Sequence, residues 1–127
     1  MFKVVIMMKR RKDITMQEFK DYYQNTHIPN VMAILPPTDI LPNVHRRNFV
    51  IRDDSFLDSV ADGRTDPNPP FDCLTEVEYE TREDAEASMQ LFFDPKYLPD
   101  LKADEAKFID LSTVKYYVVE CIEIKFK

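Results

Sequence analysis

The stretch "FKVVIMMKRRKDITMQEF" (2–19) combines a strand with the start of a helix, and this pairing decides the fold. Its first eight residues are rich in Val, Ile and Phe and too few for a core helix, so they predict a strand. Thr15 is followed three residues later by Glu18, the spacing of a capping box, which predicts that a helix begins at this point.

The rest of the chain continues the alternation. Strands are expected at 43–51, 71–79 and 113–126, and a second helix at 81–93. The polar stretch between the second and third strands, 52–70, has five aspartates and three prolines and is expected to be a mobile loop.

Prolines should limit the helical segments. Pro29 and the prolines after it predict that the first helix stops near residue 27, with a short turn at 30–35. Pro95 and Pro99 should break up the segment after the second helix, before a helical turn within 103–110.

The order β-α-β-β-α-β predicts an α+β fold, the ferredoxin-like plait, in a single domain covering residues 1–127. Two helices cover one face of such a sheet and leave the other bare. Because the last strand is apolar on both sides, we expect a homodimer joined through the bare faces, with a cavity between sheet and partner.

Composition excludes several classes of function. A net charge of −6 argues against a nucleic-acid partner, and no apolar run reaches the ~18 residues of a membrane span. A single glycine excludes the Gly-rich loops that bind nucleotide phosphates, so we expect no such cofactor. Cys73 and Cys121 lack metal-ligand spacing and are interpreted as two buried thiols of a cytoplasmic protein; with two scattered histidines, no metal site is expected.

His27 is the best candidate for acid–base chemistry, because an imidazole exchanges protons near neutral pH. The helical spacing places it on one face with Phe19 and Tyr23. It is either a proton shuttle or a helix-end histidine satisfied by a backbone carbonyl. Asp104, Glu105 and Asp110 could orient it, or could anchor the turn that precedes the last strand.

The second and third strands supply candidates for substrate binding. In the second strand, His45 and Arg47 share one face and Arg46 takes the other, so one arginine could bind a substrate anion. In the third strand, the alternation directs Asp72 and Glu76 toward the expected cavity. Each of these charged residues could instead form an ordinary surface contact or ion pair.

Aromatic side chains supply further candidates. Tyr23 and Tyr117 are expected to line the cavity wall, although core packing explains them equally well.

Three segments resemble a known family, the EthD-like proteins. They are "FKVVIMMKRRKDITMQEFKDYYQNTHIPNV", "FDCLTEVEYETREDAEASM" and "DEAKFIDLSTVKYYVVE", in the family's order. The chain departs from the family pattern at Tyr23, where many members have Trp, and in the 52–70 insertion.

The resemblance implies a dimeric α+β barrel with one pocket per subunit and no metal, haem or flavin. It also implies a hydrophobic, acidic, often aromatic carbonyl substrate, and its "H-x-P" motif coincides with His27. The expected function is a cofactor-independent lyase, a decarboxylase or a dehydratase/cyclase, of aromatic polyketide biosynthesis. The alternatives are a non-catalytic module that binds a hydrophobic small molecule and an isomerase of a lactone-type aromatic catabolite.

Overall fold

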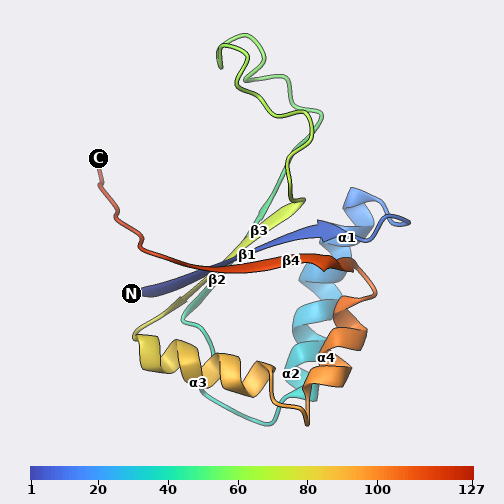
Figure 1. Ribbon diagram of the computed structural model, residues 1–127, viewed down its shortest axis with the longest axis vertical. Helices are drawn as coiled ribbons and strands as arrows, with labels where there is room; N and C mark the ends of the chain where they lie inside the picture. Colours follow the sequence, from blue (N-terminus) through green and yellow to red (C-terminus); the bar gives the residue numbers. More distant parts are fainter.

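The computed structural model describes residues 1–127 and contains four strands, four α-helices and one π-helical turn (Figure 1). The elements are β1 (Phe2–Arg10), α1 (Met16–Tyr22), η1 (Tyr23–His27), α2 (Ile28–Ile34), β2 (Val44–Phe49), β3 (Cys73–Tyr79), α3 (Arg82–Phe92), α4 (Leu98–Glu105) and β4 (Ile109–Val119). The predicted second helix, 81–93, is present as α3 without a break, whereas the first helical region is divided into α1, η1 and α2.

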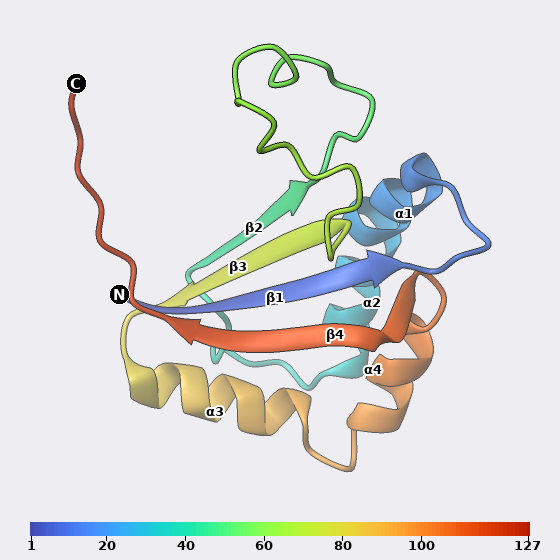
Figure 2. The same ribbon diagram turned by 45° about the horizontal axis from the view of Figure 1, so that its top comes forward.

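The four strands form one antiparallel sheet in the order β2-β3-β1-β4. Strand β3 lies between β1 and β2, which is the split-βαβ arrangement. Figures 1 and 2 show all the helices against one face of this sheet. The predicted α+β, ferredoxin-like plait is confirmed.

The first helical region runs on without a break through its π turn. The capping box is present: the Thr15 hydroxyl accepts from the Glu18 backbone N–H at 3.1 Å, and the Glu18 carboxylate accepts from the Thr15 N–H at 3.0 Å. The prediction that this helix stops near residue 27 is wrong, because α2 follows η1 directly. Pro29 lies in the first turn of α2, where the wider π turn accommodates its ring and its missing N–H.

Two other predicted boundaries are wrong. Pro99 lies in the first turn of α4, which a fixed φ favours, and so it begins this helix rather than breaking it. Strand β4 ends at Val119, not at residue 126, because its last partner is Lys3, near the start of β1. Residues 120–127 extend away from the sheet (Figure 2).

The core lies between the sheet and the helices. Phe19 and Phe108 are fully buried and pack against each other with ring centroids 5.7 Å apart. Alternate β3 residues face them, and Cys73 and Thr75 are fully buried. Burying each large apolar side chain contributes about 1.5–3 kcal/mol, so this cluster fixes the start of α1 and the end of α4 on the sheet.

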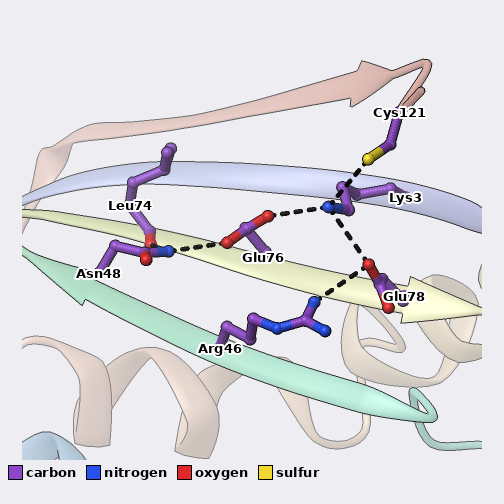
Figure 3. A network of polar contacts seen from close by, with 7 residues as sticks. All are labelled: Lys3, Arg46, Asn48, Leu74, Glu76, Glu78 and Cys121. Carbon is purple, nitrogen blue, oxygen red and sulfur yellow. Dashed lines mark hydrogen bonds and ion pairs between the residues drawn. The ribbon is translucent and has the colours of Figure 1, made fainter. Parts of the chain in front are cut away.

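The face of the sheet without helices carries a charged network (Figure 3). The Lys3 ammonium lies 2.8 Å from the Glu76 carboxylate and 3.2 Å from that of Glu78, and Arg46 contacts Glu78 at 3.0 Å. Cys121 lies 3.5 Å from the same lysine and is exposed, so the prediction that both thiols are buried is wrong. This face without helices, called the open face below, therefore carries charged groups rather than an apolar surface alone.

The long segment between β2 and β3 forms turns and projects on the side of the sheet opposite the helices (Figure 1). Asp62 and Gly63 have positive φ angles of 52° and 71°, which makes a tight reversal at its tip. Phe56, Leu57 and Val60 are exposed in it. None of the helices in the chain is long and apolar enough to cross a membrane.

Candidate active site

A cavity of about 370 Å³ lies on the helix side of the sheet. It is mostly apolar, since 14 of its 19 lining residues are hydrophobic. They come from η1, α3, α4, all four strands and the connections between them: Ile6, Met8, Tyr23, His27, Pro42, His45, Val77, Tyr79, Met89, Phe92, Phe93, Leu98, Leu101, Lys102, Glu105, Ile109, Leu111, Val114 and Tyr116. A dry pocket with few polar groups is typical of small-molecule sites.

This position corrects an expectation. The sequence placed the cavity at the open face, against a partner, whereas this pocket is enclosed by the chain's own helices and sheet. Periodicity identifies which residues share a face, but the void depends on how helices and sheet are spaced. The exposed Phe93, Leu111 and Tyr116 mark where the cavity opens.

His27 lines the cavity and is held by Asp104. Its Nδ1 lies 2.6 Å from an Asp104 carboxylate oxygen, and its side chain is only 13% exposed. Because a carboxylate accepts, Nδ1 carries the proton and Nε2, which makes no hydrogen bond, keeps its lone pair. Burial lowers the pKa of His27, more than Asp104 raises it, so the ring is a neutral base at neutral pH.

Asp104 is itself fixed by three donors. The Tyr22 hydroxyl donates to it at 2.6 Å and the Asn30 amide at 2.7 Å, in addition to His27. Burial alone would raise the pKa of this carboxyl, but the three hydrogen bonds together lower it. Asp104 therefore stays ionised and holds the imidazole through Nδ1.

The local sequence explains how His27 reaches this place. His27 is the last residue of the π turn η1, which is one residue wider than an α-helical turn. Such turns occur often at functional sites. Phe108 and Tyr23 pack against the imidazole with ring centroids 4.9 and 5.5 Å away. The helix-end alternative, a histidine bonded to a backbone carbonyl, does not describe this contact set.

Strand β2 brings His45 and Arg47 to the helix side. His45 lines the cavity, and its Nδ1 is buried without a partner. Burial and the nearby Arg47 lower its pKa to about 4, so it is neutral as well. The Arg47 guanidinium lies 5.5 Å from the centre of the Tyr23 ring, and the arginine does not line the cavity.

Tyr23 forms part of the wall of this cavity on the helix side. Its hydroxyl bonds the buried Thr75 hydroxyl at 2.7 Å. Burial raises the pKa of this phenol, so it remains protonated at neutral pH.

Four predicted site residues lie on the open face or at its edge. Glu76 and Arg46 belong to the charged network there, and Lys3 and Asn48 lower the pKa of Glu76 rather than leaving it raised. Asp72 accepts from the Arg10 backbone N–H at 2.7 Å and pairs with Arg52. Tyr117 pairs with Val5 across the sheet, with its side chain 48% exposed.

Asp110 also lies outside the cavity. Its carboxylate accepts from the Ser112 hydroxyl at 2.6 Å and from the Ser112 N–H, which lowers its pKa. It closes a turn at the start of β4, which was the structural alternative for this residue. The structure brings together Tyr23, His27, His45 and Asp104, and separates them from Arg46, Asp72, Glu76, Asp110 and Tyr117.

Two polar residues of α4, Glu105 and Lys102, also line the pocket. Lys102 was not among the candidates from the sequence. Glu105 was considered there only as a turn anchor or as a residue that orients His27, because the sequence does not show that α4 lines the cavity.

Known proteins show the same fold. The model of the EthD domain family matches residues 11–112. An EthD family protein from Bacillus halodurans C-125 has 17% identity and a TM-score of 0.56, over 96% of this chain and 100% of that one. A protein from Arabidopsis thaliana has 9% identity and a TM-score of 0.57, over 99% and 100%. None of the curated proteins matches the chain.

Proposed function

Because the chain belongs to the EthD domain family, we propose that it is a cofactor-independent lyase acting on an aromatic, polyketide-like acid. One observation carries the proposal: a neutral imidazole, oriented by a buried carboxylate, is at the wall of an apolar cavity. This arrangement supports a general base whose tautomer is fixed before substrate binds.

The common step is proton transfer at a carbon next to a carbonyl group. In a dehydration, His27 Nε2 takes the proton from this carbon, and an enolate forms as the carbonyl π pair moves to oxygen. The enolate collapses, the C–O bond at the β-carbon breaks, and the imidazolium gives its proton to the departing hydroxyl, which leaves as water. In a decarboxylation, the neutral imidazole first takes the proton of the substrate's carboxyl group, CO2 leaves with formation of the enolate, and the imidazolium returns the proton to the carbon. Both steps benefit from a site that excludes water.

The cavity lining supports an aromatic substrate. Its apolar side chains suit flat rings, and its volume is at the small end of the range for ligand pockets, about 300–1,000 Å³. No arginine lines it, so an acid group of the substrate would meet Lys102, an exposed residue of the lining.

We also propose that a second copy of the chain covers the open face. Val5, Met7 and Leu74 lie on that face with Tyr117, around the charged network of Lys3. In a two-fold dimer the same face of both copies meets, so apolar groups of one copy can pack on apolar groups of the other and its acidic groups can pair with basic ones.

A test needs no knowledge of the natural substrate. The exchange of the α-protons of α-tetralone, an aromatic ketone, into D2O reports enolisation and is followed by proton NMR. We expect the protein to accelerate exchange over buffer and His27→Gln to lower this acceleration by about 10²–10⁴-fold. The matched control is Glu123→Gln in the exposed tail, which should exchange like the unmodified protein.

The same experiment distinguishes an enzyme from the non-catalytic binding module. A binding module would bind α-tetralone, seen as line broadening, without exchanging its protons faster than buffer. That result, or full exchange by a folded His27→Gln variant, would refute the proposed proton transfer by His27. The position of His27 on the cavity wall favours the enzyme over the module.

A further inference from the structure

Glu105 is an ionisable group of the cavity that the proposed reaction has not used. It lines the pocket, and its carboxyl group makes no hydrogen bond or ion pair. Its apolar neighbours in the lining include Leu101 on the same helix and Ile109 just after it. No hydrogen bond or ion pair ties this half-buried carboxyl group to the fold, so it remains available to a molecule bound in the pocket.

Its position on α4 relates it to the base. Asp104 and Glu105 are consecutive residues at the end of this helix. The side chains of successive helix residues point about 100° apart, so the carboxyl groups of these two neighbours point in different directions. Asp104 points toward α2, where it accepts from Asn30, and it also binds Nδ1 of His27. Glu105 lines the same pocket as His27.

We propose that Glu105, as a carboxylic acid, donates a hydrogen bond to the carbonyl oxygen of the substrate while His27 works at the adjacent carbon. This inference rests on the proposed function for its chemistry and on the cavity for its geometry. When the C–H electron pair moves toward the carbonyl oxygen, the acid proton moves toward the same oxygen, and the enol forms without a free enolate. Donors aimed at a developing oxyanion are among the strongest contributions to catalysis in a dry site.

The charge environment keeps the acid form available. Burial and the nearby Asp104 raise the pKa of Glu105 to about 7, although Lys102 lowers it in part. From the other elements, the ionisable groups of the lining are Tyr23, His27, His45, Tyr79 and Tyr116. Burial lowers the pKa of both histidines and raises that of all three tyrosines, Tyr116 to about 12. Glu105 therefore changes its charge near neutral pH while these groups stay neutral.

The sign of the effect follows from the group. Glu105 donates only while it is protonated, so the hydrogen bond to a bound ketone is present below about pH 7 and is lost above it. Ionisation of the carboxyl would also repel the enolate of the reaction.

The experiment uses the naphthyl ketone dye Prodan, whose emission shifts to the red when its carbonyl accepts a hydrogen bond. We expect bound Prodan to show red-shifted emission in acid and to lose this shift as the pH rises through about 7. Glu105→Leu should remove the shift at every pH while leaving the dye bound. Glu123→Gln, a matched loss of a carboxylate in the exposed tail, should keep the pH-dependent shift.

A second variant and a melting-temperature measurement test the proposal even if Glu105→Leu does not fold. Glu105→Gln is nearly isosteric, and above neutral pH it should melt no lower than the unmodified protein, since it removes an unpaired charge from the cavity. A lower melting temperature for both variants would assign Glu105 a structural role and overturn the proposal.

The results separate this proposal from the proposed function. A pH-independent Prodan spectrum that Glu105→Leu leaves unchanged overturns the role of Glu105, even if α-tetralone exchange depends on His27. A Glu105-dependent spectrum without any exchange supports the donor and overturns the enzyme. Failure of Prodan to bind at all overturns the proposal as well, because the cavity then does not accept an aryl ketone.

Discussion

Asp104→Asn is the sharpest perturbation of the site, because it changes one charge and almost no volume. The carboxylate accepts from Tyr22 at 2.6 Å, from Asn30 at 2.7 Å and from His27 at 2.6 Å. Hydrogen bonds to charged groups contribute about 1.5–3 kcal/mol each, and an amide keeps one acceptor oxygen while turning an NH2 toward the other donors. We expect the free energy of unfolding at neutral pH to fall by about 2–4 kcal/mol.

The variant should also reverse the tautomer of His27. An asparagine NH2 donates to Nδ1, which places the ring proton on Nε2 and removes the lone pair that the proposed proton transfer uses. We expect α-tetralone exchange to fall by about 10²–10⁴-fold. Long-range ¹⁵N–¹H correlation of the histidine ring identifies the protonated nitrogen directly, and urea denaturation measures the stability.

The loss of stability should depend on pH. The folded protein lowers the pKa of Asp104 below its ordinary value of 3.8, so the ionised carboxylate stabilises the fold above that value. This stabilisation is lost as the pH falls through the lowered pKa, and the gap between the two proteins should narrow in acid. Asp58→Asn, in the exposed loop, is the matched control. An Asp104→Asn protein with unchanged tautomer and undiminished exchange would refute the orienting role.

Three further predictions follow from the fold. Tyr23→Phe removes the hydroxyl bonded to Thr75 and should cost about 1–2 kcal/mol in urea denaturation, while α-tetralone exchange persists; a loss of exchange as large as that of His27→Gln would make the phenol a catalytic donor. Sedimentation at micromolar concentration should give a dimer of about 30 kDa, since the chain is 15.0 kDa, and a monomer would leave the open face uncovered. Deleting 55–67 should preserve the circular dichroism spectrum and the melting temperature, because this stretch is almost wholly exposed; unfolding of the variant would show that the loop is packed.

The sequence predicted the sheet well because strand faces follow a period of two. The β3 residues expected to face the helices, Cys73, Thr75, Val77 and Tyr79, are the buried ones. The capping box at Thr15 was equally local, and it too is present. Patterns confined to a few neighbouring residues were sufficient in both cases.

The misplaced features depend on contacts that a linear pattern does not contain. Pro29 indicates a helix end by its own chemistry, but the π turn before it relieves the clash. The end of β4 depends on where β1 begins, and the cavity depends on the spacing of helices above the sheet. The sequence therefore offered Asp104 as one of several possible partners of His27, and its alternation put Asp72 and Glu76 on the side of the sheet away from this pocket.

The neighbours Asp104 and Glu105 illustrate how environment, rather than residue type, assigns a role. Asp104 is buried and Glu105 is half-buried, and burial alone would raise the pKa of each. Asp104 meets three donors, which outweigh burial and keep it charged, whereas Glu105 meets none and has a pKa of about 7. A charged acceptor fixes an imidazole, and a neutral acid donates to an oxygen, which are the two complementary tasks of an enolisation. A helix that ends beside a histidine of the cavity wall can supply both from consecutive positions.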